Sequence, residues 1–289
     1  MEYEGIVYRP PSEAYSLIIQ VTIGCSQNQC AFCGMYKNKK FRIRQKEEVI
    51  RDLLEARRIY SKVEKIFLAD GDALICPVKN LEFILKTIQK EFPECRQVTC
   101  YASPKSVLLK KTEELKYLRK MGLSMVYMGL ESGNADILKH MKKEAGPEEM
   151  VKAAKMIHKA GIRLSVTAIS GLGGRQMWKE HAKDTGKILS AMKPEYIGLL
   201  TLMAESGTPL EKEIETGKFQ LLSPYDILIE TKEMLRHMDC PNCIFRSNHA
   251  SNYVNLRGTL NKDKTNMEEQ LDQAIQGNLH LRSEWMRAL

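Results

Sequence analysis

Residues 17–33 read LIIQVTIGCSQNQCAFC and join a short apolar run to three closely spaced cysteines. The run Leu17–Ile23 is rich in Ile, Leu and Val, as are strands that are covered on both faces. A glycine ends the run, and Cys25, Cys30 and Cys33 follow within nine residues. This stretch predicts a buried strand that delivers three thiols to the loop at its carboxyl end.

Further apolar runs alternate with helical patterns along the chain. Besides 17–23, we predict strands at 65–69, 97–101, 125–130, 163–169, 196–203 and 242–245. We predict helices at 46–59, 79–91, 111–121, 147–160, 175–192 and 224–238. Strand and helix repeated about six times indicate parallel strands with right-handed crossovers. The predicted fold is α/β, a partial (β/α)6-type barrel at 16–250 with short extensions at 1–15 and 251–289.

Polar or glycine-rich turns follow the predicted strands. In chain order they are Gly24-Cys25, Asp70-Gly71-Asp72, Tyr101-Ala102-Ser103, Glu131-Ser132-Gly133, Ser170-Gly171-Leu172-Gly173-Gly174 and Glu205-Ser206-Gly207-Thr208. Active sites of (β/α) barrels gather at the carboxyl ends of the strands. We therefore expect these turns to form one site.

The three cysteines indicate a metal centre, because thiolates select zinc, Cu(I) or iron–sulfur clusters. A structural zinc site needs a fourth Cys or His nearby, and the 40 residues after Cys33 contain neither. A 4Fe–4S cluster normally takes four cysteines, so three would leave one iron open to a ligand. A zinc-stabilised loop or three buried thiols are the alternatives.

The cysteine loop after the first strand, with the aromatic Phe32 directly before the last cysteine, resembles the radical S-adenosylmethionine (SAM) superfamily. The usual spacing there is CxxxCxxC, whereas this chain has CxxxxCxxC. The resemblance implies a 4Fe–4S cluster on Cys25, Cys30 and Cys33. It also implies that SAM binds the open iron through its amino and carboxylate groups and is cleaved by an electron from the cluster to a 5′-deoxyadenosyl radical.

The same resemblance assigns five residues to SAM binding, namely Phe32, Gly71, Asp72, Glu131 and Ser170. Asp72 stands where the superfamily has the acid of a GGE-like motif, and Glu131 stands in its fourth-strand motif. Ser170 opens the turn that resembles the segment lining the adenine and ribose. For Asp72 the alternative is an aspartate that caps a helix, and for the turn at Ser170 it is an ordinary glycine turn.

For the substrate we predict contacts from Asp70, Ser103, Glu205, Arg246, Asn248 and His249. The last three belong to a polar run that directly follows the predicted strand at 242–245. A solvated polar loop is the alternative for that run. Cys240 and Cys243 form a CxxC pair, which indicates an auxiliary cluster, a redox pair or two buried thiols.

Residues 8–13 and 246–264 resemble a branch of small stand-alone enzymes that are often labelled oxygen-independent coproporphyrinogen oxidase-like. The chain also resembles the queuine lyases of gut anaerobes. These enzymes cleave a C–N bond to remove the cyclopentenediol of queuine and leave an aminomethyl-deazaguanine base. The resemblance implies a lyase of queuine salvage that acts on a small molecule, with a reductase, flavodoxin or ferredoxin as electron donor.

Composition is that of a soluble globular protein, with 43% hydrophobic and 28% charged residues. No apolar stretch reaches the roughly 20 residues needed to cross a bilayer, and the first residues do not resemble a secretory signal, so we expect a cytoplasmic protein. The net charge is +8, and the basic residues are scattered along the chain, which argues against nucleic-acid binding. A radical enzyme acting on tRNA or a tetrapyrrole, and a non-catalytic iron–sulfur or zinc protein, are the alternative functions.

Overall fold

The structure is a computed structural model that describes residues 3–288. Within these residues the chain divides into two compact units. Unit 1 contains residues 3–28, 35–128 and 152–164. Unit 2 contains residues 29–34, 129–151 and 165–288. The cysteine motif is shared between them, because Cys25 lies in unit 1 and Cys30 and Cys33 lie in unit 2.

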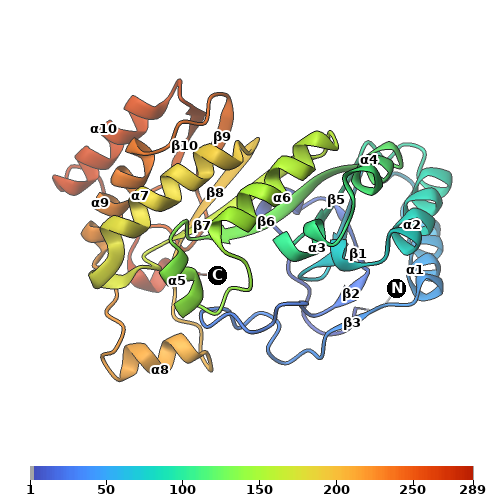
Figure 1. Cartoon of the computed structure of the whole chain (residues 1–289), viewed down its shortest axis with the longest axis horizontal. Helices are drawn as coiled ribbons and strands as arrows, with labels where there is room; N and C mark the ends of the chain where they lie inside the picture. The colour runs from blue at the N-terminus through green and yellow to red at the C-terminus, as the bar shows by residue number, and fades with distance from the viewer. Residues whose placement is uncertain (1–2, 289) are drawn as a thin grey trace. The chain divides into compact units, whose positions relative to one another are not determined.

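Unit 1 is built on a parallel sheet whose strands are, in order, β1 (Leu17–Gln20), β4 (Lys65–Ala69), β5 (Gln97–Tyr101) and β6 (Leu123–Glu131). The longer helices are α1 (Lys46–Ile59), α2 (Val78–Glu91) and α4 (Thr112–Lys120), and α1 packs beside α2 (Figure 1). The short elements are η1 (Pro11–Glu13), β2 (Thr22–Ile23), β3 (Arg42–Ile43), η2 (Ala73–Ile75) and α3 (Pro104–Leu108). Parallel pairing places the residues that follow β4 and β5 at one edge of this sheet.

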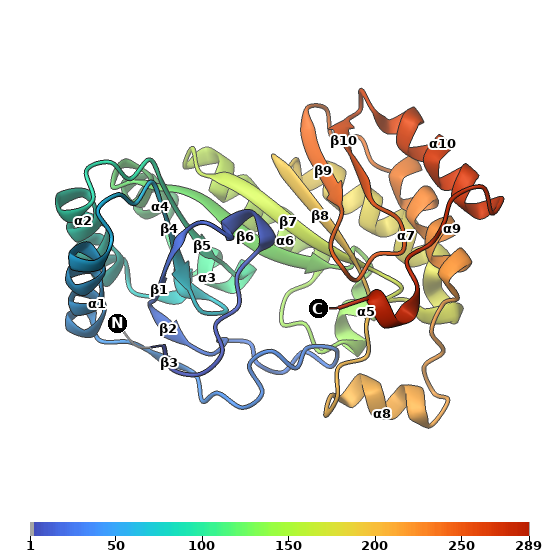
Figure 2. The same ribbon diagram turned by 180° about the vertical axis from the view of Figure 1, so that it is seen from behind.

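Unit 2 contains the parallel strands β7 (Arg163–Ser170), β8 (Tyr196–Thr201) and β9 (Cys243–Ser247), followed by the antiparallel β10 (Leu256–Leu260). Its longer helices α7 (Gly174–Met192), α9 (Pro224–Arg236) and α10 (Lys264–Ile275) lie side by side (Figure 2). Its other helices are α5 (Ala135–His140), α8 (Pro209–Glu215) and η3 (Glu284–Met286), and the helix α6 (Pro147–Lys159) begins in unit 2 and belongs to unit 1 from Lys152 onward.

The main elements agree closely with the sequence. The strands predicted at 65–69 and 97–101 are β4 and β5, and the helix predicted at 46–59 is α1. Four of the five residues of β4 are buried, as expected for a strand covered on both faces. The parallel strands and their connecting helices confirm the α/β class.

Some elements were not predicted. The helices α3, α5 and α8 have five to seven residues, which is too short for a helical period to stand out. The C-terminal extension contains β10, which pairs with β9, and the helix α10. No helix within residues 3–288 is both long enough and apolar enough to cross a membrane.

A glycine sets the distance between α7 and α9. A Cβ atom on Gly186 would lie 2.7 Å from both the Cβ of His237 and the carbonyl oxygen of Met234. Backbone atoms cannot yield to such an overlap as a flexible side chain can. We predict that Gly186→Ala destabilises the fold by about 1–3 kcal/mol despite the better helix propensity of alanine.

Urea unfolding of both proteins measures this effect. Gly198→Ala is the control, because a Cβ at Gly198 in β8 has no described heavy atom within 4 Å beyond its chain neighbours. A Gly186→Ala variant as stable as the unmodified protein would contradict this account of the helix contact.

Candidate functional site

Cys25 follows β2 and lies against the turn after β4 in unit 1. Its Sγ is 4.0 Å from the carbonyl oxygen of Gly71. A Cβ on Gly71 would lie 2.8 Å from the Cβ of Cys25 and 2.8 Å from Cε2 of Tyr36. Only glycine at position 71 allows this approach, so the glycine of the Asp-Gly-Asp turn is required by packing against the cysteine.

Asp70 is fully buried beside the same loop. Its Oδ2 accepts hydrogen bonds from the Gly24 amide at 3.0 Å and from Lys39 Nζ at 2.8 Å. The Asp70 and Lys39 side chains are 0% and 10% exposed, so this is a buried ion pair. The sequence assigned Asp70 to substrate binding, but its carboxylate has no exposed surface, and the chain itself uses Oδ2, whereas the buried Oδ1 has no hydrogen-bond partner among the described residues.

Asp72 is also fully buried, and it accepts hydrogen bonds from Ser26, Ser103 and Ser106. Ser26 Oγ donates to Oδ2 at 2.5 Å, while Ser103 donates its Oγ to Oδ2 at 2.8 Å and its amide to Oδ1 at 2.9 Å. Burial raises the pKa of Asp72, and the serine hydrogen bonds oppose that shift. The sequence assigned Asp72 to SAM and Ser103 to the substrate, but in the structure these two residues are hydrogen-bonded to each other.

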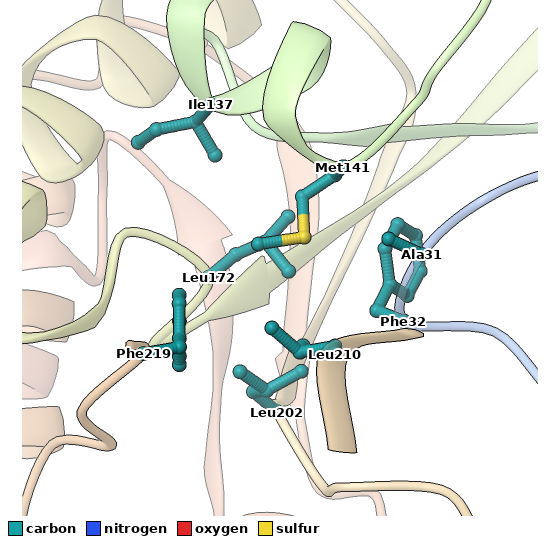
Figure 3. Packing of buried hydrophobic residues seen from close by; sticks show 8 residues of the cluster. All are labelled: Ala31, Phe32, Ile137, Met141, Leu172, Leu202, Leu210 and Phe219. Carbon is teal, nitrogen blue, oxygen red and sulfur yellow. The ribbon is translucent and has the colours of Figure 1, made fainter. Parts of the chain in front are cut away.

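The segment Cys30–Cys33 is held in unit 2 by both backbone and side chain. The Ala31 amide donates to the Met141 carbonyl at 2.9 Å, and the Leu210 amide donates to the Ala31 carbonyl at 3.0 Å. Phe32 is 8% exposed. Figure 3 shows the apolar cluster around it, which consists of Ala31, Phe32, Ile137, Met141, Leu172, Leu202, Leu210 and Phe219. Cys30 and Cys33 pack against this cluster.

Glu205 lies after β8 and bonds to the residue that follows Cys33. Its Oε2 accepts from the Gly34 amide at 3.0 Å, and a Cβ at Gly34 would lie only 2.6 Å from that oxygen. Burial raises the pKa of Glu205, and the Gly34 hydrogen bond partly offsets the shift. Among the described residues no other hydrogen bond to this half-buried carboxylate is found, so Oε1 can accept from a ligand.

Glu131 ends β6 and forms an ion pair with Lys143 at 2.9 Å, with both side chains 13% exposed or less. Its φ of 65° is rare for a residue with a side chain and costs about 1–3 kcal/mol. A Cβ on Gly129 would overlap the Glu131 carboxylate at 1.9 Å. The backbone at this strand end is thus shaped around the carboxylate that the sequence assigned to SAM.

Ser170, at the end of β7, is bonded to a residue that the sequence analysis missed. Ser170 Oγ and the Gly171 amide each donate to Oε2 of Glu230 at 2.5 Å. Glu230 lies on α9, is fully buried, and its Oε1 has no hydrogen-bond partner among the described residues. An acid on the apolar stripe of α9, between Ile227 and Met234, was the available signal.

β9 extends to Ser247, so Arg246 lies within the strand and not after it as predicted, and the polar run is divided between two faces. Arg246 and Asn248 are exposed, whereas Ser247 between them is buried. His249 is partly buried and its Nδ1 is 3.0 Å from Ser251 Oγ, while burial lowers the pKa of its imidazole. No bond joins these three residues to the other predicted site residues of unit 2 among those described.

A second residue that the sequence analysis missed is Glu13, in the N-terminal segment of unit 1. It is fully buried and accepts from Thr99 Oγ1 at 2.9 Å and from the Tyr127 hydroxyl at 2.5 Å. Ser16 also donates to it. Glu13 therefore ties the N-terminal segment to β5 and β6.

Two cavities lie at different ends of the strands. One of about 360 Å³ in unit 1 is lined by Gln97 and Arg163, at the amino ends of β5 and β7, which is not the edge that carries Asp70 and Asp72. Another of about 170 Å³ in unit 2 is lined by Gly171 and Thr201, at the carboxyl ends of β7 and β8. The smaller cavity is the one near predicted site residues.

The remaining cysteines differ from those of the motif. Cys240 and Cys243 are free, buried thiols, and burial raises their pKa values to about 11 and about 12. A 4Fe–4S cluster normally takes four cysteines, so this buried pair alone does not form an auxiliary cluster site. Cys25, Cys30 and Cys33 are all partly exposed and fit a solvent-accessible metal centre better.

In residues 3–288 no three His, Cys, Asp or Glu side chains form a preformed metal site, so the donor set is judged on its chemistry.

Glu230 supplies a test of this geometry through pH. Burial raises its pKa from the ordinary 4.5 to about 7, so the folded state holds the proton more tightly than the unfolded state. Its stabilising contribution is complete below about pH 4.5 and is lost as the pH rises through about 7. We predict that the melting temperature of Glu230→Gln, relative to that of the unmodified protein, rises between pH 5 and pH 8.

Circular dichroism melts at the two pH values measure this difference, with Glu269→Gln on the exposed face of α10 as the control. If the melting temperatures of Glu230→Gln and the unmodified protein differ by the same amount at both pH values, Glu230 is ionised throughout and the prediction is wrong.

The chain is similar to known proteins in both sequence and fold. The family described as the Radical SAM superfamily matches residues 19–185. An uncharacterised protein of Methanocaldococcus jannaschii is 23% identical over 234 residues, which are 78% of this chain and 72% of that protein. Among solved structures, coproporphyrinogen III oxidase from Escherichia coli, a radical SAM enzyme, aligns with a TM-score of 0.58 at 19% identity over 76% of this chain.

The radical SAM methyltransferase TsrM from Kitasatospora setae, solved with cobalamin and a [4Fe-4S] cluster, aligns with a TM-score of 0.57 at 15% identity over 75% of this chain. The chain spans 52% and 43% of these two solved enzymes, and the likeness confirms the predicted partial (β/α)6-type barrel. As the cysteine motif predicted, the chain belongs to the radical SAM superfamily, whose cofactors are a 4Fe–4S cluster and SAM.

Proposed function

We propose that this protein is an enzyme in which Cys25, Cys30 and Cys33 hold the cluster and SAM is cleaved to act on a small molecule. The observation that carries the proposal is the contrast among the cysteines. The three motif thiols are partly exposed, whereas Cys240 and Cys243 are buried. Three sulfur ligands leave one iron of a 4Fe–4S cluster open for SAM.

When bound, the reduced cluster supplies the electron that splits the sulfonium of SAM and yields a 5′-deoxyadenosyl radical. The protein supplies position and exclusion of water. Phe32 holds the Cys30–Cys33 segment in its apolar cluster, and Gly71 lets the turn after β4 approach Cys25. Glu131 and Ser170 lie at the strand ends where the superfamily receives SAM.

The cluster assignment is tested with Cys30→Ala. We predict that after anaerobic reconstitution this variant loses most of its iron and sulfide and forms no 5′-deoxyadenosine from SAM and dithionite. Cys95→Ala is the matched control, because Cys95 is also a partly exposed thiol but lies outside the motif. Full iron content in Cys30→Ala would overturn the assignment, and equal loss in both variants would show that the effect is not specific.

For the substrate we propose queuine, with cleavage of the C–N bond that joins its aminomethyl group to the cyclopentenediol. The resemblance of the chain to queuine lyases supports this choice. Glu205 offers a half-buried carboxylate whose Oε1 can accept from the guanine-like edge of the base. Asn248 and His249 offer amide and imidazole groups for the diol. The buried Asp70 is not part of this proposed set.

Reconstituted protein with SAM, dithionite and queuine should release the aminomethyl-deazaguanine base, detected by mass spectrometry. We predict that Glu205→Gln lowers kcat/KM about 10-fold or more, the usual cost of losing one hydrogen bond to a charged group. The iron content stays unchanged, because the oxygen of the glutamine can still accept from the Gly34 amide. Glu215→Gln, an exposed acid on α8, is the control. No base from cluster-loaded enzyme would reject queuine and leave the radical SAM assignment standing.

A further inference from the structure

We propose that Asp72 is a positioning residue for the cluster ligand Cys25, acting through the hydroxyl of Ser26. The inference rests on the proposed role of Cys25. It differs from the role that the resemblance assigned to Asp72, which was to bind SAM. In the structure the Asp72 carboxylate is fully buried and receives its hydrogen bonds from this chain.

The hydrogen bonds of Asp72 connect the cysteine loop to a rigid element. Ser26 follows Cys25 directly, and its Oγ donates to Asp72 at 2.5 Å. Ser103 holds the same carboxylate through its amide and its hydroxyl. Ser103 is itself the N-cap of α3, where its Oγ accepts from the Ser106 amide at 3.0 Å. The residue after Cys25 is thus anchored to the start of a helix.

The residue before Cys25 is anchored in the same way. The Gly24 amide donates to Asp70, and Lys39 neutralises that buried carboxylate. Gly71 lies between the two aspartates and leaves no space for a Cβ atom against Cys25. Both neighbours of Cys25 are therefore held by buried carboxylates. These bonds restrict the backbone of residues 24–26.

A carboxylate suits this position because every group that faces it is a donor. An ionised carboxylate only accepts, and Asp72 accepts from the hydroxyls of Ser26, Ser103 and Ser106 and from the Ser103 amide. In Asp72→Asn one oxygen could still accept from the Ser103 amide, but the hydroxyls would have to turn to accept from the amide nitrogen, and the bond to Ser26 would lose its charge. The link to Ser26 would weaken although the size of the side chain is unchanged.

The test separates positioning from SAM binding by changing Ser26 and leaving Asp72 in place. The full chain is reconstituted anaerobically, and the loss of iron to a chelator is followed for the unmodified protein and for Ser26→Ala, Ser26→Thr and Asp72→Asn. We predict that Ser26→Ala and Asp72→Asn lose iron about fivefold faster or more, the size of one hydrogen bond. Ser26→Thr keeps the hydroxyl and should behave as the unmodified protein.

The double variant Ser26→Ala/Asp72→Asn should lose iron less quickly than the sum of the two single effects predicts, because both changes act on the same link. If Asp72→Asn fails to fold, Ser26→Ala decides alone, with melting of the cluster-free proteins as the check on folding. Iron loss in Ser26→Ala at the unmodified rate overturns the inference. If the unmodified protein itself takes up no iron, the proposed function fails instead.

Discussion

Buried carboxylates that accept hydrogen bonds from the cysteine loop are the constraint on which the site depends. A carboxylate removed from water is costly unless donors replace the water. In unit 1 these donors are Gly24 and Ser26, which flank Cys25, and the acceptors are Asp70 and Asp72. In unit 2 the donor is Gly34, which follows Cys33, and the acceptor is Glu205, which is only half-buried. In each case the residue that satisfies the acid is the neighbour of a proposed cluster ligand.

The remaining part of the loop is fixed by apolar packing. Phe32 lies between Cys30 and Cys33 in sequence, and its ring is buried in the cluster formed with Leu172, Leu202 and other residues of unit 2. The backbone of Ala31 adds a hydrogen bond on each side. The aromatic residue before the last cysteine therefore has a structural role as an anchor, in addition to the contact with SAM that the resemblance implies.

Most of the fold could be predicted because its signals are local. The apolar run of β4 and the helical pattern of α1 each act within a few residues, and both elements have the predicted bounds. The partners within the site could not be predicted, because they depend on tertiary contacts. Asp72 and Ser103 are 31 residues apart, Ser170 and Glu230 are 60 apart, and Gly34 and Glu205 are 171 apart. The sequence placed acids at the strand ends but could not show that the chain itself supplies the donors for Asp70 and Asp72.

The central claim is that three cysteines leave one iron of the cluster open and that SAM occupies it. The most direct test is the electron paramagnetic resonance spectrum of the reduced, reconstituted protein recorded with and without SAM. We predict that SAM shifts the g values, because a new ligand on one iron changes the electronic structure of the cluster. A spectrum unchanged at high SAM concentration would mean that the fourth iron is already closed, which would contradict the account.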